Sequence, residues 1–230
     1  MLQYNFFGKD CLIDQQLANR EDLNQKLLEL NFKCSEVLLL NQVHGKEVII
    51  IDDASKIYGT QGLPKVDGIV TNLPNVAIGV VTADCGPILF YDNSSKIIGA
   101  CHAGWKGAKN GIIEATIKAM KSLGSSEINA IIGPMIQQYS YQVSADFYDE
   151  FLLESINNKK YFKISNNNKS KWQFDLPSYI TDKLYKNSVV NVDNLNIDTY
   201  TNMAKYNSYR RYCHLNEENH ARNISVICMN

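Results

Sequence analysis

The chain has 230 residues, of which 45% are hydrophobic and 20% charged, and its formal net charge is −1. This length and composition suit a globular protein with a hydrophobic core. The nearly neutral charge gives no electrostatic reason to expect a nucleic-acid or membrane partner. No apolar run approaches the roughly 18 residues of a transmembrane helix, and the N-terminus lacks the basic-then-apolar order of a signal peptide. We therefore expect a cytoplasmic protein.

The first third of the chain combines one helical pattern with two strand patterns. Leucines recur near one face of a predicted helix over Asn19–Leu30. Short apolar runs then predict strands at Val37–Leu40 and Val48–Ile51.

The middle third has the strongest pattern, because its apolar runs are short and rich in Val and Ile. These runs predict strands at Gly68–Thr71, Val76–Val81, Pro87–Tyr91, Ile97–Cys101 and Ile128–Ile132. Between the last two, the spacing changes to that of one helix over Trp105–Leu123, which Gly124 ends.

The last third contains two further helices and two further strands. Helices are predicted at Ala145–Ile156 and Pro177–Tyr185, and strands at Val189–Val192 and Ile224–Met229. Strands and helices are mixed without strict β-α-β alternation. We therefore expect an α+β fold, with central mixed β-sheets flanked by helices in a layered arrangement, and a single domain over residues 1–230.

Reactive residues lie in three short segments, at 41–45, 82–87 and 101–107, each at the end of an apolar run and close to a Gly. Such a placement suits side chains that a rigid strand holds at a cleft. The six cysteines of the chain include no Cys-x-x-Cys pair. We interpret them as thiols rather than disulfides.

One residue from each segment gives a set of two histidines and a cysteine: His44, Cys85 and His102. Imidazole and thiolate are ligands that zinc prefers, and three protein ligands leave a fourth position open, as in catalytic sites. Copper is the alternative metal, because it binds such ligands more tightly. Cys101 alternates with His102 along a strand, so we expect Cys101 to face the core.

Other interpretations use the same residues. A lone buried Cys is usually a small hydrophobic residue. Alternatively, Cys85 is a nucleophile with His102 as its base, as in thiol hydrolases, although the additional His44 favours a metal. A non-catalytic, metal-stabilised binding module would close the metal with a fourth protein ligand, and Asp84 is the nearest candidate in sequence.

Cationic residues form a second group of candidates. Arg210 and Arg211 stand among tyrosines, where they would bind a phosphate or stack on a base; the alternative is a solvated edge strand. Alternation along a strand would let one of them reach the cleft. Lys106 follows the third metal-ligand candidate closely and is also expected to neutralise phosphate. His214 and His220 are interpreted as loop residues without a metal role.

Five motifs occur in a fixed order: Gln42-Val-His-Gly45, Ala83-Asp-Cys85 with Pro87, His102-Ala-Gly-Trp105 with Gly107, Ile132-Gly-Pro134 and Ser208-Tyr-Arg-Arg211. Together they resemble the purine nucleoside phosphorylase family, which is also described as the multicopper polyphenol oxidoreductase or laccase-domain family. The resemblance extends from about Asn19 to Met229.

The resemblance implies stacked layers, with helices outside a central pair of sheets, and one zinc ion at the catalytic residues His44, Cys85 and His102. It also implies phosphorolysis of adenosine, guanosine or methylthioadenosine, and deamination of adenosine, so that a purine nucleoside and phosphate are the expected partners. The laccase description would instead require several copper ions. The four histidines of the chain are too few for such a ligand shell, and we rank a copper-dependent polyphenol oxidoreductase second.

The chain departs from the family pattern at several positions. Lys106 stands where the family usually has Arg, Met135 where it often has Cys, and Gln142 where it usually has Glu. Residues Tyr212–Arg222 replace a short glycine-containing turn, with a match at Arg222 alone. These changes leave the metal ligands intact and affect the expected substrate contacts.

Overall fold

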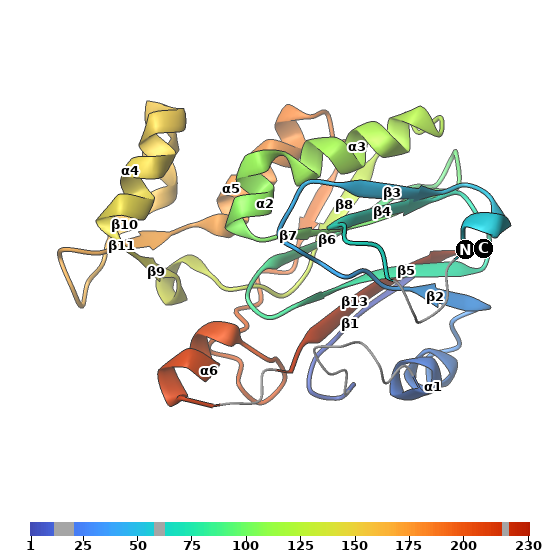
Figure 1. The fold of residues 1–230 in the computed structure, drawn as a ribbon, viewed down its shortest axis with the longest axis horizontal. Helices are drawn as coiled ribbons and strands as arrows, with labels where there is room; N and C mark the ends of the chain where they lie inside the picture. The colour runs from blue at the N-terminus through green and yellow to red at the C-terminus, as the bar shows by residue number, and fades with distance from the viewer. Residues whose placement is uncertain (12–20, 58–62, 218–220) are drawn as a thin grey trace.

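The computed structural model describes residues 1–11, 21–57, 63–217 and 221–230, and has the predicted layered α+β fold (Figure 1). Two β-sheets lie face to face with helices outside them. The predicted helix Asn19–Leu30 is α1 (Glu21–Glu29), and residues 19 and 20 lie outside the described ranges. Within those ranges, no helix is long and apolar enough to cross a membrane.

The first sheet has four strands in the order β1 (Leu2–Phe7), β13 (Asn223–Met229), β5 (Val76–Thr82) and β2 (Glu36–Leu38). β5 is antiparallel to β13 and parallel to β2. Alternate residues along β5 face opposite sides, so that Ile78 packs between the sheets and Ala77 packs toward α1. β1 was not predicted, because its sequence mixes polar and apolar residues at the sheet edge.

The second sheet has six strands in the order β12 (Val192–Asn194), β8 (Asn129–Ile132), β6 (Gly86–Asp92), β7 (Ile97–Ala103), β4 (Gly68–Thr71) and β3 (Val48–Ile51). Its strands match predicted runs closely, apart from β12. The strand predicted at Val189–Val192 begins too early, because the Val189 N–H donates to the carbonyl of Leu184 and closes the end of a helix instead.

Helices α3 (Ile112–Ser122) and α5 (Leu176–Lys186) cover the outer face of the six-stranded sheet (Figure 1). The prediction of a single helix over Trp105–Leu123 is wrong in one respect. Gly111 has a φ of 102°, in the left-handed region, and separates α2 (Trp105–Asn110) from α3. Gly124, with a φ of 104°, follows the last turn of α3 as predicted.

A small third sheet stands at one end of the molecule, at the left of Figure 1, with α4 (Ala145–Glu154) against it. Its order is β10 (Phe162–Ile164), β11 (Trp172–Phe174) and β9 (Gln142–Val143). Strands of two or three residues are too short to show an alternating pattern, so the sequence did not predict them. Short 3₁₀ helices lie at Ala54–Lys56, Gln138–Ser140 and Ile156–Tyr161.

A buried carboxylate fixes the turns at one end of the six-stranded sheet. Asp92, at the end of β6, accepts hydrogen bonds from Ser94 N, Ser95 N, Ser125 Oγ, Ser126 N and Glu127 N. Burial alone would raise the pKa of this carboxyl, but the converging donors outweigh burial and hold the pKa well below its usual range. Asp92 therefore connects the β6–β7 turn to the segment that enters β8.

The exchange Asp92→Asn is expected to lower the free energy of unfolding by about 2–4 kcal/mol, because charge-assisted bonds are lost and a buried amide must find new partners. A carboxyl with a lowered folded pKa stabilises the fold above its unfolded pKa of about 3.9, and this contribution is lost as the pH falls below it. Denaturant titrations between neutral and acid pH measure both effects. Asp175→Asn is the control, since Asp175 caps α5 at a position where Asn is equally good.

Candidate metal centre

The first ligand candidate, His44, lies between β2 and β3 in a segment that two side chains fix. Gln42 donates from Nε2 to the carbonyl of Val81 at 2.7 Å, and the Val81 N–H donates back to Gln42 Oε1 at 2.8 Å. His44 itself has a φ of 60°. This left-handed conformation turns the chain sharply and lets the following Gly45 lead away from the site.

The second fixing side chain is Asp67, which is completely buried directly before β4. Its carboxylate accepts the backbone N–H groups of Val43, His44 and Gly45 at 3.1, 2.9 and 2.7 Å. The same carboxylate accepts from His102 Nδ1 at 2.8 Å. One residue thus positions two of the three ligand candidates.

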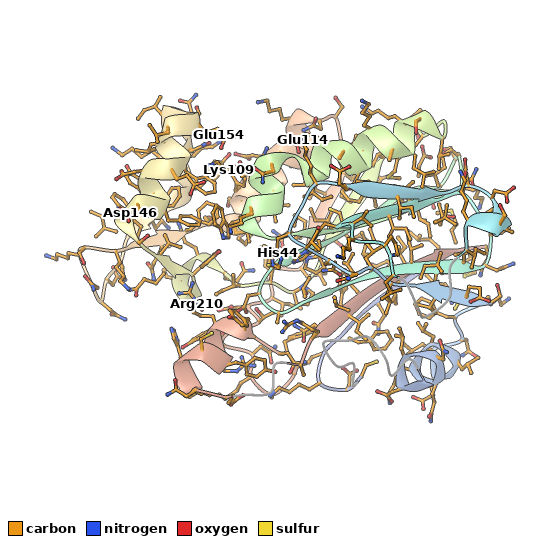
Figure 2. All side chains as sticks on the ribbon, viewed as in Figure 1. His44, Lys109, Glu114, Asp146, Glu154 and Arg210 are labelled. Carbon is orange, nitrogen blue, oxygen red and sulfur yellow. The ribbon has the colours of Figure 1, made fainter. Side chains whose placement is uncertain are left out.

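Cys85 lies in the turn between β5 and β6, and His102 lies in β7, so both come from the strand ends. The ligand atoms of His44, Cys85 and His102 all lie within 4.8 Å of one another. The two imidazole rings have centroids 4.6 Å apart and are inclined at 78°. The three residues thus converge from separate segments, although only His102 lies within a strand, whereas their spacing predicted three strands. Figure 2 shows His44 near the middle of the molecule, by the strand ends.

Steric constraints explain why the third residue of the His-Ala-Gly-Trp run is a glycine. A Cβ built on Gly104 would lie 2.8 Å from Cys85 Sγ and 3.3 Å from His44 Cδ2. Any other residue would therefore push into the space between the ligands. Gly104 keeps that space free, which fits a site that receives an ion.

Charge coupling favours a thiolate at this site. Burial raises the pKa of the Cys85 thiol, but the opposing effect of His102 and His44 is larger and brings this pKa down to about 6. Burial lowers the pKa of His102, whereas Cys85 and Asp67 raise it to about 9. The thiolate is the form that binds metals, and the bond from Nδ1 to Asp67 directs the other ring nitrogen of His102 toward Cys85. The donor set and its orientation fit a zinc ion.

Neighbouring residues of the ligands point elsewhere. Cys101 lies in the hydrophobic core, as expected from alternation with His102. Asp84 is in a turn with a φ of 88°, and its carboxylate accepts from Thr199 Oγ1 at 2.7 Å and from the Arg210 N–H at 2.6 Å. Among the described residues, Asp84 therefore does not belong to the ligand group, and that group has three members.

The cationic candidates lie on two helices. The expectation of a C-terminal strand is wrong, because Arg210 and Arg211 lie in the first turn of α6 (Tyr209–Leu215), capped by Ser208. A Tyr-rich sequence can form a short helix when a capping residue starts it. The Ser at the start of the motif Ser208-Tyr-Arg-Arg211 is such a residue. His214 is also in α6 rather than in a loop, and His220 lies outside the described residues.

The two arginines differ in their surroundings. Arg210 is half-buried; its Cζ lies 5.4 Å from the ring centroid of Tyr141, and its Nη1 donates to the Gln142 carbonyl at 2.7 Å. Figure 2 shows Arg210 on the side of α6 nearer to β9. Arg211 is buried and donates to the carbonyls of Thr199, Tyr200 and Tyr206 at 2.8, 2.7 and 2.6 Å. Lys106 is exposed in the first turn of α2.

Sequence reasoning missed Asp67. Its signal is an acidic residue directly before the apolar run Gly68–Thr71, where a solvated carboxylate would not be expected. Sequence reasoning also missed the contact of Tyr141 with Arg210, because it joins two segments that are far apart in the sequence.

Comparison with known proteins identifies the family of this chain. A profile of the family described as multi-copper polyphenol oxidoreductase laccase matches residues 13–230. The chain belongs to this family.

Curated relatives of this laccase-family chain carry a different name. A purine nucleoside phosphorylase of Rickettsia conorii is 39% identical over 206 residues, which cover 90% of this chain and 83% of the relative. A purine nucleoside phosphorylase of Rickettsia prowazekii is 37% identical and covers 92% and 83%.

Solved structures share the fold. The crystal structure of a Neisseria meningitidis protein superposes with a TM-score of 0.75 at 27% identity, covering 92% of this chain and 81% of the other. YlmD from Geobacillus stearothermophilus superposes with a TM-score of 0.78 over 100% of this chain and 90% of the other, at 21% identity, which shows similarity of fold alone.

The departures from the family pattern fall outside the ligand set. Met135 is fully buried, and its Cε would lie 3.0 Å from a Cβ on Gly86. Gln142 donates from Nε2 to Ser165 Oγ at 2.8 Å. The segment Tyr212–Arg222 begins in α6, and residues 218–220 are outside the described part. Core packing and local hydrogen bonds thus account for Met135 and Gln142.

The exchange Asp67→Asn is expected to weaken metal binding by about 10- to 100-fold, because an amide cannot hold both the three backbone donors and the His102 ring. Competition with a chelator of known affinity measures the change. Asp92→Asn is the matched control: it also removes a buried carboxylate, but far along β6 from the ligands. Equal metal affinity in wild type and Asp67→Asn would contradict the positioning role of Asp67.

Proposed function

We propose that this chain is a zinc-dependent purine nucleoside phosphorylase that cleaves adenosine, guanosine or methylthioadenosine with phosphate, and that it also deaminates adenosine. The observation that carries the proposal is the convergence of His44, Cys85 and His102 around a space that Gly104 keeps free. The names of the Rickettsia relatives support the choice of substrate class. We further propose a cytoplasmic enzyme with residues 1–230 in one domain.

The proposed roles follow from the geometry. His44, Cys85 and His102 hold the ion, which when bound supplies Lewis acidity to an oxygen of a reactant. Asp67 holds His102 in one tautomer and fixes the backbone around His44. The three bonds that Asp67 accepts from residues 43–45 mean that these groups need not reorganise during the reaction.

Phosphate needs cationic partners, and the surroundings of the three candidates rank them. We propose Arg210 as the main partner, because its backbone is bonded to Asp84, the residue before Cys85. Lys106 is a second candidate because it is exposed four positions after His102. We assign Arg211 a structural role in this proposal, since both of its Nη atoms already donate to backbone carbonyls.

The alternatives are less well supported. A laccase would need several copper ions, and the described residues contain one group of three ligands. A thiol hydrolase needs Cys85 and one base, which leaves His44 unexplained. A binding module would close the ion with a fourth ligand, and the Asp84 carboxylate is bonded to Thr199 and Arg210 instead.

A product assay tests the function. The metal-loaded protein, incubated with adenosine and phosphate, is expected to release adenine and ribose 1-phosphate, with inosine from deamination, when the products are separated by chromatography. Cys85→Ala is expected to lose bound metal by elemental analysis and to lose more than about 100-fold in activity, since loss of an outer partner alone costs up to that much. Cys213→Ala, at an exposed cysteine, is the control.

Each outcome of this assay is informative. Formation of inosine without adenine would reduce the proposal to a deaminase. Dioxygen consumption with a phenolic donor at stoichiometric copper would replace the proposal with a laccase. Full activity and full metal content in Cys85→Ala would refute the ligand assignment.

The phosphate assignment has its own test. Arg210→Met is expected to raise the KM for phosphate by about tenfold or more at unchanged metal content, because a charge-assisted contact of about 1.5–3 kcal/mol is lost. Lys106→Met is expected to act in the same direction, more weakly. Lys109→Met is the matched control, since Lys109 lies on the same helix but pairs with Glu150 at 2.6 Å. Unchanged phosphate kinetics in both variants would remove these residues from the site.

A further inference from the structure

A pair of thiols lies away from the metal centre, on the face of the four-stranded sheet that packs against α1. Cys34 precedes β2, and Cys228 lies in β13. Each thiol shifts the pKa of the other, so the two sulfurs lie close enough to interact. Cys228 Sγ also lies 3.8 Å from the carbonyl oxygen of Lys33, the residue bonded to Cys34.

The sheet register places Cys228 and the start of β2 on the same face of the sheet. β5 lies between β13 and β2, and Ala77 of β5 pairs with Cys228 on one side and with Val37 on the other. All three side chains face α1, and the small Ala77 leaves room above the sheet. The segment before β2 is fixed on both sides of Cys34, since Phe32 N donates to the Leu27 carbonyl at 2.9 Å and Ser35 N donates to the Asn75 carbonyl at 2.8 Å.

The two thiols differ in access. Cys34 is half-buried and lines a cavity of about 210 Å³ together with Leu27, Phe32 and Ser35, whereas Cys228 is buried. A small oxidant can therefore reach Cys34 first. Cys228 lowers the pKa of the Cys34 thiol to about 7, whereas Cys34 and burial raise the pKa of the Cys228 thiol, so that Cys34 is the thiol that ionises first.

We propose that Cys34 and Cys228 are a peroxide-reactive pair that forms a reversible disulfide. The Cys34 thiolate attacks one oxygen of hydrogen peroxide, the O–O bond breaks, and the released hydroxide takes a proton to become water, leaving a sulfenic acid. Cys228 sulfur then attacks Cys34 sulfur, the S–O bond breaks, and the Cys228 proton leaves with the oxygen as a second water. Two thiols lose two electrons, and one peroxide gains them.

The disulfide would join the segment before β2 to the C-terminal strand β13. Cys228 pairs with Ala77 near the start of β5, whereas Cys85 follows the other end of that strand. The bond therefore constrains the sheet without contacting the metal ligands, and the expected readout is thermal stability rather than catalysis.

Peptide mapping tests the proposal directly. Trypsin separates the two cysteines into residues 34–46 and 223–230, and neither peptide contains a second cysteine. After treatment of the reduced, metal-loaded protein with hydrogen peroxide, these peptides are expected as one species that dithiothreitol splits. The Tm is expected to rise by at least about 5 °C, because the bond closes a very long loop in the unfolded chain.

Two variants make the test decisive. Cys34→Ser is expected to remove both the linked species and the rise in Tm, while Cys213→Ser, at an exposed cysteine, is expected to behave like wild type. Free thiols in both peptides after oxidation, or a sulfinic acid on Cys34 with Cys228 still reduced, would overturn the proposal. A linked species without any rise in Tm would show that the bond forms outside the native fold, and would also overturn it.

Discussion

The carboxylate of Asp67 is the constraint on which the centre depends. It is buried, and four donors from two separate segments satisfy it: three backbone N–H groups around His44 and the ring of His102. A buried charge is tolerated when it is hydrogen-bonded this fully. Moving the His44 loop away from the strand of His102 would leave the buried carboxylate without these donors. The cost of losing them therefore holds the two segments together.

The two-sheet architecture supplies the rest of the geometry. Cys85 follows β5 of one sheet and directly precedes β6 of the other, so the chain crosses between the sheets at this residue. His102 lies on β7, which pairs with β6 so that Pro87 is opposite His102. Strand register thus fixes His102, and the short turn between two strands fixes Cys85, whereas the backbone of His44 depends on side-chain hydrogen bonds. This division explains why one ligand needs Gln42 and Asp67 to hold its backbone.

Sequence patterns predicted the layered fold and most strands of the sheets, because buried strands are uniformly rich in Val and Ile. They also identified the three ligand candidates, because His and Cys are rare beside glycine at strand ends. They failed where long-range contacts decide the structure. The role of Asp67 depends on a contact 35 positions away in the sequence, and the helix at Arg210 depends on a cap and on tertiary bonds to Asp84. Neither leaves a periodic signal.

The hydrogen bond between the Asp84 carboxylate and the Arg210 N–H connects the candidate metal centre to α6. A metal ion at the centre and an anion at Arg210 would therefore each affect the same bond. Asp84 directly precedes Cys85, and its carboxylate accepts the N–H at the start of the helix that carries the guanidinium. A ligand that shifts α6 would strain this bond, and the strain would act on the turn that holds Cys85. Whatever factor the ion applies to the affinity of such a ligand, the ligand applies the same factor to the affinity of the ion, as thermodynamic reciprocity requires. If an ion binds at the centre and an anion at Arg210, their affinities would be coupled, which is measured by titrating each in the presence of the other.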